Sequence, residues 1–187
     1  MGNVLLVVDM VVGFLEPGHN LFCGDKARDI IPNVQELIDR EMDLGSEVIF
    51  INDNHEPDDL EFEMFPVHCL AGTEETSVIP ELRRFAANII PKNRYSAFYG
   101  TELEQTLALL EPKKVTICCV CTDICILHTT ADARNRDYKV EIRESTIASF
   151  DEEAHDVALK HMENILGAKI IRCLLYTSPS PRDGLLS

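Results

Sequence analysis

The stretch NVLLVVDM, residues 3–10, decides the fold that we expect for this chain. Its apolar residues are continuous instead of alternating with polar ones, and several of them are β-branched. Such a run is typical of a strand that is covered on both faces, as the strands of parallel sheets are. The stretch has no basic leader and Asp9 interrupts it, so we interpret it as a buried strand and not as a signal peptide.

Five further β-rich runs follow, and helical stretches separate them. The runs are EVIFIND (47–53), ANIIPK (87–92), KVTICCV (114–120), YKVEIRE (138–144) and AKIIRCL (168–174). Helical patterns lie between Ile30 and Gly45, at 101–110, at 122–136, and from Ser149 to near Gly167, with capping boxes at Thr101/Glu104 and Ser149/Glu152. This alternation predicts an α/β fold: one three-layer, Rossmann-like domain over residues 1–175, with a mostly parallel six-stranded sheet and helices on both faces.

The end of the chain differs from the rest. Residues 176–187, YTSPSPRDGLLS, are rich in serine and proline and have no periodicity. We expect this tail to be disordered or not native to the protein.

The composition excludes several classes of function. The formal net charge of −15 argues against binding to nucleic acids or to an anionic membrane surface, because both are bound through lysine and arginine. No apolar run is long enough to span a membrane. Seven cysteines are an odd number in a chain without a secretion signal, which favours reduced thiols in the cytoplasm over a disulfide framework.

Four of these cysteines fall within CCVCTDIC, residues 118–125. The cluster could bind a metal, run redox chemistry through the C-x-x-C pair of Cys118 and Cys121, or contain one nucleophile. Residues three apart on an extended chain point to opposite faces, so this pair is poorly placed to chelate. Cys125 lies where a strand meets a helix, and there the unpaired N–H groups and the helix dipole stabilise a thiolate.

Polar residues also end two other runs, and ligands of such sheets bind beyond the carboxyl ends of the strands. Asp9 ends the first run and Lys92 ends the third. A helix cap or a surface turn explains Asp9 equally well, and solvation explains Lys92. A carboxylate can nevertheless shuttle protons, a lysine can favour a thiolate, and a thiolate can attack a carbonyl, so Asp9, Lys92 and Cys125 could converge on one crevice.

A set of metal-binding residue types follows the second run. Asp53 and His55 are two residues apart on an extended chain, so their side chains point to the same side. Glu61, Glu63 and His68 lie downstream. Two histidines with two carboxylates suit zinc, iron or manganese.

These residues lie in four blocks that resemble the nicotinamidase branch of the isochorismatase-like cysteine hydrolases. The blocks are VVDMVVGF (7–14), NDNHEPDD with EFEMFPVHCLAGT (52–59 and 61–73), PKNRYSAFYGT (91–101) and CVCTDICILHTTADA (119–133). They occur in the order of the family and span the chain to about Lys169.

The resemblance implies an Asp9–Lys92–Cys125 triad that hydrolyses nicotinamide to nicotinate and ammonia through a cysteine thioester, in NAD salvage. It also implies roles for further residues. One divalent ion, zinc in the first place, would be bound by Asp53, His55, Glu61 (preferred to Glu63) and His68. The backbone N–H groups of Cys121 and Cys125 would form an oxyanion hole after a cis Val120–Cys121 peptide. The substrate would be contacted by Phe14, Phe65, Tyr95 and Val120. We expect nicotinamide as the partner, no nucleic acid or membrane, and a homo-oligomer.

The sequence departs from the family pattern at a few positions. Val11 and Gly13 replace polar residues of the first block, Cys119 replaces a glycine, and Phe65 replaces a tryptophan. These changes concern the pocket and leave the triad and the proposed ligands in place.

Three alternatives remain open. The first is another amidohydrolase of the family, acting on a carbamoyl or ureido compound; such relatives keep the triad but generally lack the metal ligands. The second, of a different class, is a non-catalytic thiol or zinc-binding module built on Cys118 and Cys121. The third is a degraded family member that is kept as a binding scaffold.

Overall fold

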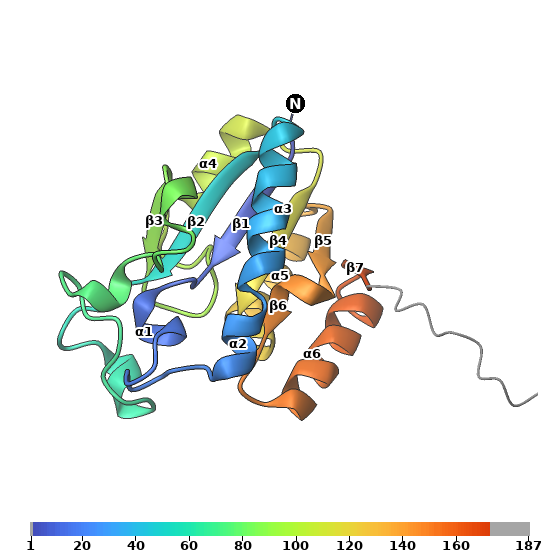
Figure 1. Ribbon diagram of the computed structural model, residues 1–187. Coiled ribbons are helices and arrows are strands. Elements are labelled where there is room, and N and C mark those ends of the chain that lie inside the picture. The colour runs from blue at the N-terminus through green and yellow to red at the C-terminus, as the bar shows by residue number, and fades with distance from the viewer. Residues whose placement is uncertain (1, 173–187) are drawn as a thin grey trace, which may run out of the picture.

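The computed structural model describes residues 2–172, and they form a parallel sheet of seven strands (Figure 1). The strands are β1 (Val4–Val8), β2 (Glu47–Asp53), β3 (Ile89–Lys92), β4 (Val115–Val120), β5 (Val140–Arg143), β6 (Ile147–Ala148) and β7 (Lys169–Ile171). Their order across the sheet is β3-β2-β1-β4-β5-β7, with β6 beside β4. Every residue of β1 is buried, which confirms the interpretation of the opening run as a strand covered on both faces.

The predicted number of six strands was wrong by one. β5 pairs with the start of β4, at Val115 and Thr116, and β6 pairs with its end, at Cys119 and Val120. β6 contains only Ile147 and Ala148, and two residues are too few to produce a periodic pattern.

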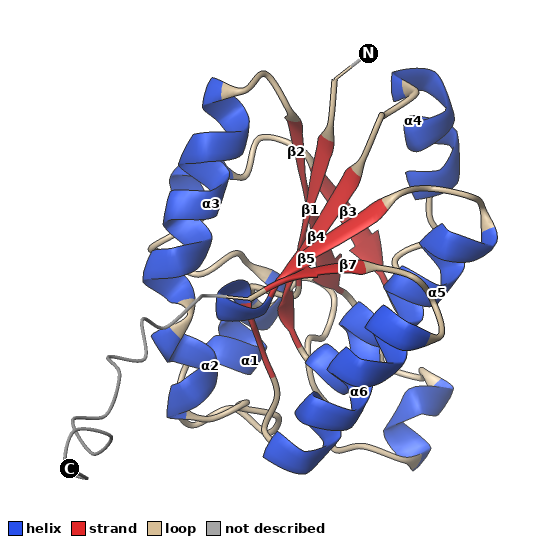
Figure 2. Ribbon diagram, turned by 90° about the vertical axis from the view of Figure 1, so that its right-hand side faces the viewer, coloured by secondary structure: helices blue, strands red, loops and turns tan. Residues whose placement is uncertain are grey.

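Helices cover both faces of the sheet, as predicted. They are α1 (Val12–Leu15), α2 (Asp25–Asp29), α3 (Ile31–Asp43), α4 (Leu103–Leu110), α5 (Leu127–Asn135) and α6 (Glu152–Asn164). Figure 2 shows α1, α2 and α3 on one face and α4, α5 and α6 on the other. Short 3₁₀ turns η1 (Leu60–Glu63), η2 (Glu74–Thr76), η3 (Arg83–Phe85) and η5 (Glu144–Thr146) lie in the connections. The three-layer α/β prediction is therefore confirmed.

The apolar periodicity of α3 explains its place on the sheet. Val34, Leu37 and Ile38 are buried in the core between helix and sheet, which stabilises the fold by about 1.5–3 kcal/mol for each large apolar side chain. The helix ends before Gly45, whose φ of 74° is a conformation that glycine adopts without steric cost.

The predicted capping box at the start of α4 does not form. The helix begins at Leu103, whose N–H donates to the Thr101 hydroxyl at 3.2 Å. The Glu104 carboxylate, which would complete the box, pairs instead with Arg136 at 3.0 Å. Glu104 thus pairs with a residue that is distant in the sequence and not with the backbone at the start of its own helix.

The predicted capping box of α6 is also wrong. Asp151 caps the helix, because its carboxylate accepts from the N–H of Ala154 at 3.0 Å. The Ser149 hydroxyl donates to Asp123 at 2.6 Å and so ties the start of the helix to the helical turn after β4.

The strand order indicates where on the sheet a ligand is expected to bind. From the central β1 the chain builds β2 and β3 on one side and then β4, β5 and β7 on the other. The carboxyl ends of β1 and β4 therefore flank the point where the order reverses, and ligands of doubly wound sheets bind at this point. The predicted helix after β4 begins as a π-helical turn, η4 (Thr122–Ile126), and continues as α5.

The expected domain end at residue 175 and the expected disordered or non-native tail at 176–187 lie outside the described residues. Within residues 2–172, no helix combines the length and the apolar character that crossing a bilayer requires.

Candidate active site

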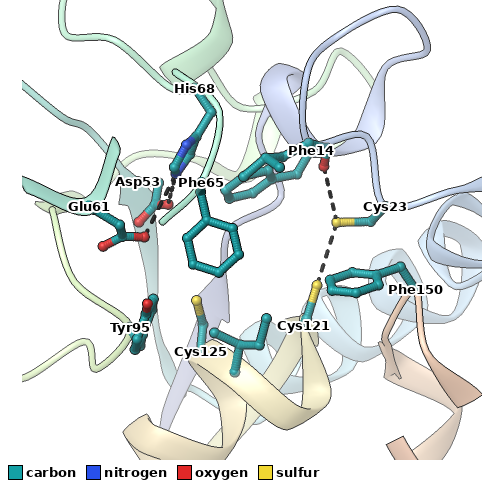
Figure 3. A pocket seen from close by; sticks show the side chains of 12 residues that line it. Phe14, Cys23, Asp53, Glu61, Phe65, His68, Tyr95, Cys121, Cys125 and Phe150 are labelled. Atoms are coloured by element: carbon teal, nitrogen blue, oxygen red, sulfur yellow. Dashed lines mark hydrogen bonds and ion pairs between the residues drawn. The ribbon is translucent and has the colours of Figure 1, made fainter. Parts of the chain in front are cut away.

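A pocket opens at the carboxyl end of the sheet (Figure 3). The space within it, including open solvent at its mouth, is about 520 Å³. Its walls come from α1, the loops after β2 and β3, the η4 turn and the loop before α6. The lining residues are Phe14, Leu21, Cys23, Asp53, Glu61, Phe65, His68, Tyr95, Cys121, Ile124, Cys125 and Phe150.

The structure brings the three predicted triad residues together. The Lys92 Nζ lies 2.9 Å from the Asp9 Oδ2 and 3.6 Å from the Cys125 Sγ. The side chains of Asp9 and Lys92 are fully buried, and Cys125 is 7 % exposed on the pocket wall. In the sequence, Cys125 is 33 positions from Lys92 and 116 positions from Asp9. The three residues meet because β1, β3 and β4 all end at the same edge of the sheet.

Asp53 is a fourth member of this charged cluster. Its register partner across β2 and β3 is Lys92, and its carboxylate forms an ion pair with the Lys92 ammonium group. Its backbone N–H donates to the Asp9 Oδ1 at 2.9 Å. Sequence reasoning separated the triad from the metal ligands, whereas the structure joins them through Asp53.

Burial and neighbouring charges give the members of this cluster different pKa values. Burial raises the pKa of Asp9 to about 6, although the Lys92 charge works against the increase. Burial also acts to raise the pKa of Asp53, but the Lys92 charge and hydrogen bonds from His55 and His68 outweigh it and hold this pKa well below its usual range. For Lys92, burial is outweighed by the two carboxylates, so its pKa is well above the ordinary value and it remains charged.

Several groups act on the thiol of Cys125. Burial raises its pKa well above the ordinary value, and the lowering by Lys92 is opposed by the charges of Asp9 and Asp53. The sequence indicated the helix start and the lysine, which favour a thiolate, and the structure adds burial and two nearby carboxylates, which oppose it. The thiol therefore needs a base to remove its proton, and Asp9 is next to it.

Three predicted metal ligands lie side by side. Ligand atoms of Asp53, His55 and His68 are all within 4.8 Å of one another, and all three residues are buried. The Asp53 Oδ2 is 3.3 Å from the His55 Nε2 and 3.6 Å from the His68 Nε2. Such a carboxylate and two imidazoles are a donor set for a borderline divalent ion.

Both imidazoles are oriented for this task. The Nδ1 of His68 donates to the carbonyl of Pro66 at 2.8 Å, and the Nδ1 of His55 contacts the Asp59 carboxylate at 3.1 Å. The Pro66 carbonyl and the Asp59 carboxylate hold each ring by its Nδ1, so each Nε2 faces Asp53 and, in the tautomer protonated at Nδ1, has its lone pair free for a metal ion.

Asp59 and Arg94 are functional candidates that sequence reasoning did not single out. The Arg94 guanidinium donates to both oxygens of Asp59, at 2.8 and 2.9 Å. Asp59 thereby stays fixed against His55. The signal was present in the block NDNHEPDD, but a carboxylate four residues from a histidine becomes informative only when both are seen to be buried.

The fourth predicted ligand is Glu61, and the structure distinguishes it from Glu63. The Glu61 Oε1 lies 3.9 Å from the His68 Nε2. Its Oε2 is buried and finds no hydrogen-bond partner within residues 2–172. Glu63 is exposed, so Glu61 is the carboxylate that faces the other three side chains.

The residues expected to hold an oxyanion lie on the other side of the pocket. The Val120–Cys121 peptide bond is cis, as the resemblance implied. Cys121 and Cys125 both line the pocket at the start of the η4 turn and within it. That their N–H groups hold an oxyanion remains a prediction.

Aromatic side chains form much of the wall. The rings of Phe65 and Tyr95 meet nearly at right angles, with centroids 6.5 Å apart, and Phe14 lies with its centroid 5.7 Å from that of His68. Val120 is fully buried and is not among the lining residues, so the wall does not support its predicted contact with the substrate. The sequence did not predict four of the lining residues, namely Leu21, Cys23, Ile124 and Phe150. Of these, Ile124 alone falls within one of the four sequence blocks.

The fold and the pocket define a three-layer α/β protein whose candidate site lies at the carboxyl end of a parallel sheet. A family model described as the isochorismatase domain matches residues 3–172, and the chain therefore belongs to the isochorismatase family.

Solved structures of this family resemble the chain over nearly its whole length. A pyrazinamidase/nicotinamidase from Streptococcus mutans is 32 % identical, with a TM-score of 0.86 over 91 % of this chain and 100 % of that one. An N-carbamoylsarcosine amidase from Thermoplasma acidophilum is 31 % identical, with a TM-score of 0.82 over 92 % and 96 %. A pyrazinamidase from Pyrococcus horikoshii in complex with zinc is 29 % identical, with a TM-score of 0.84 over 92 % and 100 %. The chain is an amidohydrolase of this family, and the resemblance recognised in its sequence is confirmed.

Proposed function

We propose that this amidohydrolase is a metal-dependent nicotinamidase, which converts nicotinamide and water to nicotinate and ammonia. One observation carries the proposal: a buried Asp9–Lys92–Cys125 cluster and a buried Asp53–His55–His68 donor set are joined within one aromatic pocket. The similarity to the Streptococcus mutans pyrazinamidase/nicotinamidase supports it.

The donor set fits a divalent ion. Asp53, His55 and His68 would hold it, and the buried, unpartnered Oε2 of Glu61 makes this residue the fourth candidate. When bound, the ion would supply a Lewis acid for the pyridine nitrogen of the substrate. We propose zinc, because imidazole and carboxylate ligands suit it; iron and manganese are the alternatives.

The reaction begins with the proton of Cys125. Asp9 accepts this proton, and its pKa near 6 leaves it ionised at neutral pH and basic enough to act. Lys92 stays charged between the two groups and stabilises the thiolate as it forms. Phe14, Phe65 and Tyr95 hold the ring and position the carboxamide against Cys125.

The thiolate of Cys125 then attacks the carboxamide carbon. The backbone N–H groups of Cys121 and Cys125 stabilise the tetrahedral oxyanion, an effect typically worth about 3 kcal/mol for each donor. Asp9 returns the proton to the leaving nitrogen, and ammonia departs. Asp9 next activates a water that hydrolyses the thioester, which releases nicotinate and restores the thiol.

A second candidate is hydrolysis of a carbamoyl compound, which the similarity to N-carbamoylsarcosine amidase favours. The triad serves both reactions. The buried donor set favours nicotinamide, since it places a site for a Lewis acid beside the nucleophile. From the resemblance we also propose a role in NAD salvage, a cytoplasmic location and a homo-oligomeric state.

The test is ammonia release by the purified full chain from nicotinamide, pyrazinamide and N-carbamoylsarcosine. Each assay is repeated after dialysis against a chelator and after zinc, iron or manganese is added back. We expect nicotinamide to be preferred, activity to be lost with the metal, and one of the ions to restore it. Preference for N-carbamoylsarcosine with no effect of the chelator would favour the second candidate.

A further inference from the structure

Cys121 has a thiol partner that the sequence did not indicate. Its Sγ lies 3.5 Å from the Sγ of Cys23, although 98 positions separate the two residues. Both side chains are buried, and both line the pocket that contains Cys125 (Figure 3). Cys118, the other cysteine of the C-x-x-C spacing, contacts Cys119 instead, with the two sulfurs 3.1 Å apart.

We propose that Cys23 and Cys121 are a redox modification site, which a peroxide entering the pocket converts to a disulfide that switches the enzyme off. Its effect on activity rests on the proposed function, whereas formation of the bond does not.

The surroundings of Cys23 permit this bond. A disulfide is about 2.05 Å long, so the two sulfurs must approach each other by roughly 1.5 Å. Cys23 belongs to the loop between α1 and α2, where Leu21 and Phe22 are half-buried and Gly24 has a φ of 87°. Cys121 is fixed between β4 and the η4 turn. The Cys23 N–H donates to the Phe14 carbonyl at 2.9 Å, so we expect the Cys23 side chain and the residues around it to supply the approach.

The chemistry balances with a peroxide as the oxidant. One thiol loses its proton and attacks a peroxide oxygen, the O–O bond breaks, and the departing hydroxide takes a proton and leaves as water. The other sulfur attacks the resulting sulfenic acid, the S–O bond breaks, and the oxygen leaves as a second water with the proton of the second thiol. Two electrons pass from the sulfurs to the peroxide.

The position of Cys121 explains why the bond would stop catalysis. Its backbone N–H is a proposed oxyanion donor, and its side chain lies on the same wall as Cys125. A disulfide pulls the Cys23 loop over this wall and keeps the substrate from reaching the donor. Loss of one such donor lowers the rate by about 10²–10³-fold, so we expect a decrease of at least roughly a hundredfold.

The first experiment detects the bond without an activity assay. The full chain carries Cys125→Ser and Cys173→Ser, which remove the nucleophile and the cysteine outside the described residues. After treatment with hydrogen peroxide, unreduced peptides are mapped by mass spectrometry. We expect a Cys23–Cys121 cross-link that dithiothreitol removes. The matched control is the Cys118–Cys119 pair, which is fully buried in β4 and should stay reduced. A Cys121 that remains a thiol or joins another cysteine overturns the proposal.

The second experiment measures the switch in the chain with Cys125 intact. Ammonia release is measured before peroxide, after peroxide, and after dithiothreitol, and each variant is compared with its own untreated rate. We expect the recoverable part of the inactivation to be smaller in Cys23→Ser than in the parent chain, because only the reversible sulfenic acids of the remaining thiols contribute to it. Equal loss and recovery in Cys23→Ser overturns the switch. A chain that hydrolyses none of the amides refutes the proposed function, while the cross-link still decides the modification site.

Discussion

The two ends of the sheet contain the same types of charged residue in different surroundings. At the carboxyl end, Lys92 lies between Asp9 and Asp53, and none of these side chains is more than 6 % exposed. At the amino end, Lys114 lies 3.1 Å from Glu141, and Lys114 is 26 % exposed.

The other contacts at the amino end extend this network, whose lysines reach solvent. Lys169 lies 3.3 Å from Glu141 and is 70 % exposed, and Lys114 also approaches Glu41 at 3.9 Å. The side chains of Glu41 and Glu141 are only 2 % and 10 % exposed, but pairs with one partner open to solvent are screened and contribute little, about 0–1 kcal/mol each.

The difference separates charged residues that are expected to serve a reaction from charged residues that only support the fold. Each buried ion loses several kcal/mol of hydration, and its partners restore this only when the cluster is complete. Buried charges that a fold does not need for its stability are expected where a reaction needs them. The comparison therefore predicts that variants at the carboxyl end affect activity and stability strongly, and that matched variants at the amino end do not.

The largest effect is expected from Cys125→Ala. Because Cys125 is the proposed nucleophile, its removal should lower ammonia release on the order of 10⁴-fold or more. Cys118→Ala is the matched control: it removes a buried thiol of β4 that does not line the pocket, and most activity should remain. A Cys125→Ala chain with the rate of the parent would contradict the mechanism.

The next effect tests the comparison itself. Lys92→Met leaves Asp9 and Asp53 buried without a counter-charge, so it should lower the free energy of unfolding by about 3–5 kcal/mol. Lys114→Met at the amino end should lower it by about 1 kcal/mol or less. The chain has no tryptophan, so urea unfolding is followed by circular dichroism. Equal losses in the two variants would remove the distinction between the two ends.

A smaller effect is expected from a residue that supports the metal site. Asp59→Ala removes the carboxylate that orients His55 and should weaken metal affinity by about 10–100-fold. Asp58→Ala, an exposed neighbour, is the control and should bind the metal as the parent does. Titration with zinc against a competing chelator measures both; indistinguishable affinities would show that Asp59 has no such role.

The smallest effect concerns pH at the amino end. Burial acts to raise the pKa of Glu141, but Lys114 and Lys169 outweigh it and hold the pKa below the ordinary 4.5. A lowered carboxyl pKa contributes stability above about pH 4.5, and this contribution is lost as pH falls through the pKa of the folded state. Glu141→Gln should therefore destabilise the chain by about 1 kcal/mol or less at pH 7 and by nothing once Glu141 is protonated. A difference that grows in acid would have the wrong sign.

Much of the fold was predictable from the sequence because its signals are local. The continuous apolar run of β1 and the 3.6-residue periodicity of α3 each reflect one segment packed on the sheet. The errors arose where a distant group competed with a local one. Ser149 was expected to cap α6, but Asp123 took its hydroxyl and Asp151 became the cap.

The candidate site was likewise predictable only in part. Polar residues at the ends of the runs and the four sequence blocks indicated Asp9, Lys92, Cys125 and the histidines. They did not indicate that the pKa of the Cys125 thiol is raised, because a pKa depends on burial and on every nearby charge.

By itself, the sequence determined the α/β class, the family and the residue types that line the carboxyl end of the sheet, since these depend on periodicity and on short blocks. Only the tertiary structure decided that Asp53 joins the proposed triad to the proposed metal ligands, that Glu61 and not Glu63 faces them, and that Cys23 meets Cys121. The physical reason is that such contacts depend on strand register and on which side chains are excluded from water. Both are properties of the assembled sheet, and no single segment encodes them.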